Sequence, residues 1–229
     1  MAQPRLPRSN VRIVIIEDHT LFAESLDLAL TVEGYDVRRI VMSGEATAAT
    51  VLAAAIRLRP RIVLLDLDLG RLGDGVRLVA PLAKSGAAVV VVTASDEMSR
   101  WGHCIARGAR KVLSKSRPLN DTLSTVRKLN QGTSVMDVEE RERLLAAWQT
   151  EHERTGDLST RLERLTGREQ QVLGNLMEGR TVREISRSSV VSEATVRTQV
   201  KSILAKLEVS SQLAAVGVAH RVRWRPPPS

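Results

Sequence analysis

The chain has 229 residues, and its 43% hydrophobic and 26% charged residues are the composition of a folded globular protein. Its single cysteine, Cys104, excludes an intrachain disulfide framework and a cysteine-based zinc site. The net charge of +8 fits a nucleic-acid partner, an anionic surface, or simply an arginine-rich solubilising surface. No apolar run approaches the roughly 20 residues of a spanning helix, and the N-terminus lacks a signal peptide's apolar segment. We therefore expect a cytoplasmic protein without membrane association.

Residues 11–131 alternate between short apolar runs and amphipathic segments. Runs rich in Val, Ile and Leu predict strands at 12–16, 37–42, 61–66, 87–93 and 111–114. Segments of helical character lie near 20–33, 45–58, 75–85, 97–107 and 119–130. Strands that are apolar on both faces and alternate with helices predict an α/β fold with a doubly wound, five-stranded parallel sheet. Residues 1–10 before it are expected to be a disordered arm.

The second half of the chain is helical throughout. Residues 132–160 predict an acidic helical linker, with a charged helix at 137–155, and residues 161–224 predict a small all-α domain of four helices. The segment 161–229 has twelve basic and six acidic residues. Helix starts are marked by capping residues, namely Thr166 with Glu169, Thr181 with Glu184, Ser192, and Ser210 or Ser211. The proline-rich residues 225–229 predict a disordered tail.

Polar residues stand where four of the predicted strands end. Glu17 and Asp18 follow the first strand, Asp66 ends the third, Thr93 ends the fourth, and Lys115 follows the fifth. Because ligands of doubly wound sheets bind at the carboxyl ends of the strands, these side chains should gather at one edge. Clustered carboxylates repel one another without a cation, and Mg²⁺ prefers oxygen ligands. With such a cation present, an aspartate can attack a phosphoryl group.

The motifs IIEDH (15–19), LLDLDL (64–69), VVVVTAS (89–95) and GARKVLSK (108–115), in this order, resemble the receiver domain of two-component response regulators. The resemblance covers residues 11–131 and implies a role for each matching position. These roles are phosphoacceptor for Asp66, Mg²⁺ or Mn²⁺ ligation for Glu17, Asp18, Asp66 and the backbone carbonyl of Asp68, a switch hydroxyl for Thr93, and phosphate pairing for Lys115.

Two stretches depart from the receiver pattern. The loop LGRLGDG (69–75) lacks the usual proline and is one residue longer, and we expect its Asp74 to cap the following helix rather than to react. Val112 stands where the family usually has an aromatic residue that swings inward on activation, and Lys111 replaces a common glycine. The sequence therefore supports the phosphorylation chemistry better than the usual aromatic relay.

The segment EATVRTQVKSILAKL (193–207) predicts a helix with two different faces. Its apolar stripe consists of Val196, Val200, Ile203, Leu204 and Leu207. The remaining surface carries Arg197, Thr198, Gln199, Lys201 and Ser202. Such groups fit the major groove of DNA, where Arg and Lys find guanine acceptors and phosphates, although a plain solvated face would look similar in isolation.

Residues 165–209 resemble the LuxR-type helix-turn-helix along their whole length, through LT-x-RE, EG, EI, S-x-x-TV and KLEV. The resemblance, to the NarL/FixJ subclass, implies that the helix 193–207 reads double-stranded DNA. The contacts expected from it are Arg197, Thr198, Gln199, Lys201 and Ser202. The fourth helix, 211–222, is commonly a dimer contact in such proteins.

The sequence thus predicts a DNA-binding transcriptional response regulator whose Asp66 is phosphorylated by a histidine kinase. It would act as a homodimer, at least when active, work with RNA polymerase, and be no enzyme beyond its self-catalysed phosphoryl uptake. One alternative is a phosphorylation-independent receiver used for dimerisation or ligand sensing. Another is a free-standing phosphoryl-transfer enzyme, which the basic helix-turn-helix opposes. A further hypothesis is that the acidic residues of 137–155 dock on a basic face in the inactive state.

Overall fold

The computed structural model describes residues 7–42 and 46–226. The chain divides into two compact units, Met1–Gln149 and Thr150–Ser229. Within the described ranges, no single helix is long and apolar enough to cross a membrane, and only two short helices near the C-terminus, bent by 53°, pass that test together by length and composition.

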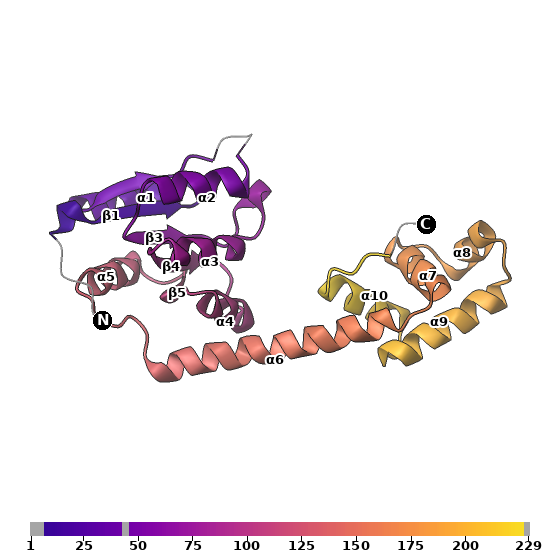
Figure 1. Cartoon of the computed structure of the whole chain (residues 1–229). Coiled ribbons are helices and arrows are strands. Elements are labelled where there is room, and N and C mark those ends of the chain that lie inside the picture. The colour runs from indigo at the N-terminus through magenta and orange to yellow at the C-terminus, as the bar shows by residue number, and fades with distance from the viewer. Residues whose placement is uncertain (1–6, 43–45, 227–229) are drawn as a thin grey trace. The chain divides into compact units, whose positions relative to one another are not determined.

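The first unit is built on a parallel sheet whose strand order is β2-β1-β3-β4-β5 in the described residues (Figure 1). The strands are β1 (Arg12–Ile16), β2 (Asp36–Arg39), β3 (Ile62–Leu65), β4 (Ala88–Thr93) and β5 (Lys111–Ser114). Ile16 pairs with Leu65, and Thr93 pairs with Ser114. The strands therefore end at one edge, and this topology confirms the predicted doubly wound fold.

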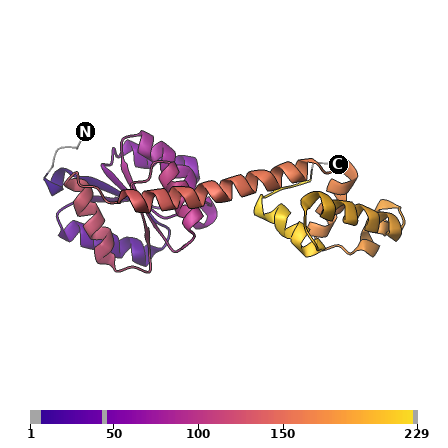
Figure 2. The same ribbon diagram turned by 90° about the horizontal axis from the view of Figure 1, so that it is seen from below.

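Helices cover both faces of this sheet (Figure 2). They are α1 (Thr20–Val32), α2 (Ala48–Arg57), α3 (Val76–Lys84), α4 (Met98–Ala106) and α5 (Leu119–Asn130). Val14 and Ile16 of β1 pack into the core under α2, α3 and α4, whereas Ile13 and Ile15 pack into the core under α1 and α5. Alternate side chains of a strand point to opposite faces, which is why an unbroken apolar run serves two cores.

Several boundaries differ from the sequence prediction. The second strand ends at Arg39 instead of residue 42, and residues 43–45, at the expected start of the second helix, lie outside the described part. That helix begins at Ala48, because Thr47 caps it by accepting a hydrogen bond from the Thr50 amide. Part of the expected N-terminal arm, Arg8–Asn10, forms a short 3-10 helix, and residues 1–6 lie outside the described ranges.

The predicted charged helix is longer than expected. It runs as α6 from Val138 to Glu163, past the expected end at 155. Its first turns pack on the first unit, where Leu144 is buried and lies so close to Gly102 of α4 that any Cβ there would collide with the Leu144 carbonyl. The rings of His103 and Trp148 stack with centroids 5.9 Å apart. An ion pair between Lys111 of β5 and Glu140 adds to this contact, and the hypothesis of docking on a basic face in the inactive state stays a prediction.

The described part of the second unit contains the end of α6 and four further helices. These are α7 (Gly167–Met177), α8 (Val182–Ser189), α9 (Glu193–Leu207) and α10 (Gln212–Arg221). The expected capping residues are confirmed at each start, with capping boxes at Thr166 and Thr181 and single caps at Ser192 and Ser211. Pro226, placed in the expected disordered tail, lies against Gly174 of α7, and residues 227–229 are outside the described part.

Candidate functional site

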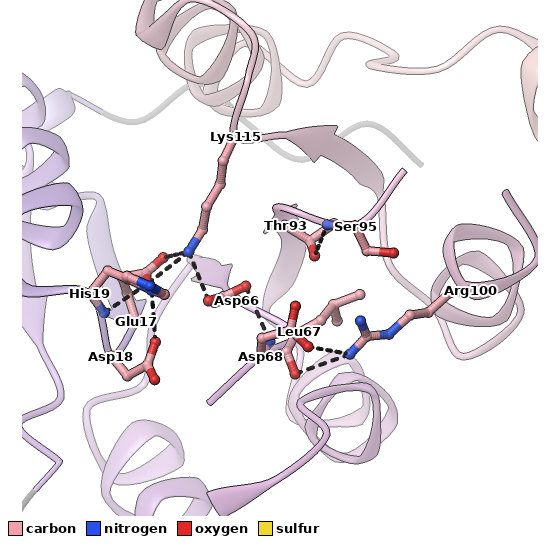
Figure 3. Close-up of polar contacts among 10 residues, drawn as sticks. All are labelled: Glu17, Asp18, His19, Asp66, Leu67, Asp68, Thr93, Ser95, Arg100 and Lys115. Carbon is pink, nitrogen blue, oxygen red and sulfur yellow. Dashed lines mark hydrogen bonds and ion pairs between the residues drawn. The ribbon is translucent and has the colours of Figure 1, made fainter. Parts of the chain in front are cut away.

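An acidic pocket lies at the edge of the sheet where β1, β3, β4 and β5 end (Figure 3). Glu17, Asp66 and Thr93 are buried, with exposed fractions of 8%, 2% and 0%. The Lys115 ammonium donates hydrogen bonds to Glu17 Oε1 and Asp66 Oδ2, both at 2.8 Å. The structure thus brings together the five side chains that the sequence predicts at this edge, since Asp18 follows Glu17 directly.

The electrostatics of the pocket show more negative charge than its one lysine balances. Burial raises the pKa of Glu17, and the nearby charge of Asp66 adds to that rise, while hydrogen bonds from Lys115 and the His19 amide oppose it. Burial disfavours the charged form of Lys115, but its hydrogen bonds to Asp66 and Glu17 outweigh burial and raise its pKa. The lysine is therefore held as a cation between two carboxylates.

The donor set suits a hard divalent cation. Glu17, Asp18, His19 and Asp66 each offer one ligand atom, and all four atoms lie within 4.8 Å of one another. Three of the four are carboxylates, the oxygen donors that Mg²⁺ and Mn²⁺ favour, and the raised pKa of Glu17 is relieved by such a charge. His19 is not among the ligands that the sequence predicts. Its Nδ1 lies 3.0 Å from Asp18 and 3.2 Å from Glu17.

The atypical loop after Asp66 forms one wall of the pocket. Gly70 has φ 53° in a short 3-10 turn, and a Cβ at that position would lie 2.9 Å from Asp18 Oδ2. A Cβ on Gly75 would collide with the backbone oxygen of Asp66. The N-cap of α3 is Gly75 and not the expected Asp74, and no side chain caps it; the Asp74 carboxylate instead accepts a hydrogen bond from the amide of Val76, two residues further on. Glycine is thus required where the loop meets the acids.

Arg100, which the sequence reasoning missed, reaches this loop from α4. Its Nη2 lies 2.9 Å from Asp68 Oδ1 and 3.2 Å from Asp74 Oδ1. Burial opposes its charge, but the hydrogen bonds to the two aspartates raise its pKa. The sequence signal for such a residue is indirect: Asp68 and Asp74 follow Asp66 closely, and their charges need a cation from elsewhere in the chain.

The expected aromatic position near the switch hydroxyl holds Val112, whereas an aromatic ring from α4 contacts the loop after Thr93. Thr93 Oγ1 accepts a hydrogen bond from the Ser95 amide at 3.2 Å. Trp101 of α4 donates its indole N–H to the Ser95 carbonyl at 2.8 Å. Val112 is buried in the core under α4, and its neighbour Lys111 pairs with Glu140. Of the second atypical stretch, Val112 therefore packs inside the domain and Lys111 packs against α6.

The helix α9 presents most of its expected polar face to solvent. Arg197, Thr198 and Lys201 are exposed, and Gln199 is half-buried. Ser202 is different, because its hydroxyl donates a 2.6 Å hydrogen bond to Glu169 of α7. Ser202 therefore supports the packing of two helices, and we leave it out of the DNA-contact set proposed below.

Comparisons with known proteins agree with this geometry. Residues 13–127 match the family model of the response regulator receiver domain, and residues 163–219 match that of the bacterial regulatory proteins of the luxR family. The fold and the acidic pocket thus define a receiver domain joined to a LuxR-type helix-turn-helix domain. The chain belongs to the response regulators, as a DNA-binding transcriptional regulator of a two-component system.

Curated relatives match over nearly their full length. The transcriptional regulatory protein LiaR of Bacillus subtilis (strain 168) is 25% identical over 213 residues, which cover 92% of this chain and 97% of LiaR. The response regulator protein VraR of Staphylococcus aureus (strain NCTC 8325 / PS 47) is 26% identical over 208 residues, covering 90% and 94%. The solved structure of a complex of the response regulator RcsB with DNA has a TM-score of 0.50 at 21% identity, covering 93% and 99%, and shows similarity of fold.

Proposed function

We propose that Asp66 is the phosphoacceptor of this response regulator and that a histidine kinase is the donor. The observation that carries the proposal is the 2.8 Å hydrogen bond from Lys115 to Asp66 Oδ2, in a buried pocket shared with Glu17 and Asp18. The buried carboxylate is ready as a nucleophile, and a cation stands beside it where negative charge from a phosphoryl group would arrive.

The transfer follows from these contacts. An oxygen of the Asp66 carboxylate attacks the phosphorus of a phosphohistidine, an O–P bond forms, and the P–N bond breaks with its electron pair left on the imidazole. Lys115 then pairs with a phosphoryl oxygen, and the Thr93 hydroxyl donates to another. Glu17, Asp18, Asp66 and the Asp68 carbonyl would hold Mg²⁺ or Mn²⁺, which neutralises charge on the phosphoryl oxygens when bound.

Intact-mass measurement tests the acceptor. The full chain is incubated with acetyl phosphate and Mg²⁺, and we expect one phosphoryl adduct that hydroxylamine removes. Asp66→Asn should give no adduct, whereas Asp27→Asn, a change on α1, should label like the wild type. Absence of an adduct in the wild type, with acetyl phosphate and with a phosphorylated kinase, would refute phosphorylation control. The receiver would then act without phosphate, in dimerisation or ligand sensing, an alternative that the aliphatic Val112 favours.

For the second unit, we infer that α9 enters the major groove of double-stranded DNA. The exposed Arg197, Thr198 and Lys201, together with Gln199, form the proposed contact set, and α8 braces α9 as the first element of the helix-turn-helix. Phosphorylation would shift an existing equilibrium so that a homodimer binds two half-sites and engages RNA polymerase. The salt dependence of binding, described below, tests the groove contact.

A further inference from the structure

Arg100 bridges the two ends of the loop 68–74, which follows Asp66. Its Nη2 lies within hydrogen-bond reach of the Asp68 and Asp74 carboxylates, at 2.9 and 3.2 Å, and 3.4 Å from the Leu67 carbonyl (Figure 3 shows the contacts with Asp68 and Leu67). Asp68 and Asp74 also form an isolated antiparallel backbone bridge, and the Gly75 amide donates to the Leu67 carbonyl at 2.7 Å. The guanidinium of Arg100 thus holds together the two ends of the loop, at Asp68 and at Asp74.

The base of the loop matters because the backbone of Asp68 touches the acceptor. The Asp68 amide donates a 3.2 Å hydrogen bond to Asp66 Oδ1. Its carbonyl is the one proposed above to face the divalent cation. The orientation of this single residue therefore reaches both the nucleophile and the metal site.

Backbone hydrogen bonds and a short 3-10 turn hold the loop internally, but its residues are intrinsically flexible. It contains Gly70 and Gly73, both at positive φ, and no proline between Asp68 and Asp74. Glycine is the most flexible residue of an unfolded or opened loop. In addition, the two carboxylates at its base repel one another unless a cation lies between them. A cation from a different helix supplies both the attraction and a fixed point.

We propose that Arg100 is a positioning residue that clamps residues 68–74, so that the Asp68 backbone is preorganised for the divalent cation and for Asp66. The inference rests on the proposed function of this pocket. Arg100 touches neither the acceptor carboxylate nor a reacting atom, and it acts through Asp68 and Asp74.

A purely electrostatic part for Arg100 predicts the opposite result. A positive charge beside an acidic cluster weakens cation binding, so its removal would by charge alone strengthen the binding of Mg²⁺ or Mn²⁺. A clamp predicts weaker binding, since residues that orient metal ligands typically change affinity by about 10- to 100-fold when they are removed. The sign of the change separates the two.

The experiment titrates Mn²⁺ into the full, unphosphorylated chain and follows the free ion by electron paramagnetic resonance. We expect Arg100→Ala to weaken binding by about tenfold or more, and Arg100→Lys to recover part of the loss. Arg110→Ala is the matched control, because it removes the same charge at the opposite edge of the sheet, and it should bind Mn²⁺ as tightly as the wild type or slightly more tightly. Circular dichroism establishes that each variant is folded, and Arg100→Gln replaces the alanine variant if that one unfolds.

Equal or tighter Mn²⁺ binding by folded Arg100→Ala or Arg100→Gln would overturn the clamp. The acetyl phosphate labelling of the wild type reports separately on the proposed function. A wild type that labels, combined with unchanged metal affinity in the variants, refutes only the clamp. A wild type that labels neither with acetyl phosphate nor with a phosphorylated kinase refutes phosphorylation control, whatever the variants do with Mn²⁺.

Discussion

Among the residues that the structure describes, each unit buries one glutamate against a lysine, and the two glutamates differ in their electrostatics. Glu17 in the first unit and Glu169 in the second are 8% and 6% exposed. Lys115 donates to Glu17, and Lys206 donates to Glu169 at 2.6 Å. Yet the pKa of Glu17 is raised, mainly by burial, whereas hydrogen bonds from Lys206 and Ser202 overcome burial and lower the pKa of Glu169 to about 2.

The difference lies in how many carboxylates share the donors. Lys115 is divided between Glu17 and Asp66, and each carboxylate repels the other. Glu169 has Lys206, the Ser202 hydroxyl and the Thr166 amide to itself. Glu169, which shares its donors with no other described carboxylate, joins α7 to α9 and stabilises the fold. Glu17 also has donors, but it shares its lysine with Asp66, so the pocket keeps negative charge that a bound cation can neutralise, as the proposed function requires.

The largest expected effect is the loss of stability when Glu169 is removed. Glu169→Ala should lower the free energy of unfolding of the second unit by about 3 kcal/mol, because it leaves Lys206 without its buried partner and removes a capping box. Urea denaturation followed by circular dichroism measures it, with Glu163→Ala, an exposed position on α6, as the control. A loss below about 1 kcal/mol would mean that the hydrogen bonds around Glu169 contribute little.

The pH dependence of that loss sharpens the comparison. The folded-state pKa of Glu169 is about 2 against an ordinary value of 4.5, so its stabilisation is fully present above the ordinary value and disappears as the pH falls toward 2. The difference in unfolding free energy between the wild type and Glu169→Ala should therefore be constant from pH 7 to about 5.5 and shrink below about 4.5. A difference that does not change with pH would contradict an ionised Glu169.

The two lysines should respond differently to Mg²⁺. With divalent cations removed by a chelator, Lys115→Ala is expected to lower the free energy of unfolding by about 2 kcal/mol. This is less than the cost of breaking a buried ion pair in which both groups stay charged, because Glu17 can take up a proton. Saturating Mg²⁺ should restore most of that loss, because an ion that binds only the folded state stabilises it. Lys206→Ala should lose stability that Mg²⁺ does not restore. Thermal unfolding with and without Mg²⁺ measures both, and equal rescue of the two variants would break the comparison.

Neutralising Glu17, which shares its lysine with Asp66, should cost little stability. Glu17→Gln removes a charge that burial disfavours, so the unfolding free energy in chelator should change by less than about 1 kcal/mol. Mn²⁺ affinity should nevertheless fall by about tenfold, because an oxygen anion of the pocket is lost. Glu24→Gln on the exposed surface of α1 should change neither quantity. Strong destabilisation by Glu17→Gln in chelator would show that Glu17 is a structural residue like Glu169.

The smallest effect concerns the two lysines of α9 itself. Lys206 is tied to Glu169, whereas Lys201 is exposed and belongs to the proposed DNA contacts. Lys201→Ala should weaken DNA binding by about tenfold for all sequences and lower the slope of log affinity against log salt by about one. Fluorescence anisotropy across salt concentrations measures it. Lys128→Ala, which removes the same charge from α5, is the control, and binding that is insensitive to salt would exclude the groove contact.

Local patterns predicted most of the fold and the pocket. The strands Arg12–Ile16 and Lys111–Ser114 have the bounds that their apolar runs indicated. The caps at Thr166 and Thr181 are also as predicted, because a capping box is defined within four residues. Glu17, Asp66 and Lys115 meet because a parallel sheet brings its strand ends to one edge, a property of topology that follows from the alternation of strands and helices.

Tertiary packing alone determined the partners that join distant elements. Arg100 and Asp68 are 32 residues apart in the chain, and Ser202 and Glu169 are 33 apart. No periodic pattern in the sequence marks either pair, because Arg100 and Ser202 each look like an ordinary polar surface residue of a helix. The sequence by itself therefore determined the family, the sheet and the identity of the acidic pocket, through patterns that local backbone chemistry repeats. Only the packed fold decided that Arg100 is the cation beside the loop after Asp66 and that Ser202 ties α9 to α7. The reason is that both contacts depend on distances and burial between elements far apart in the chain.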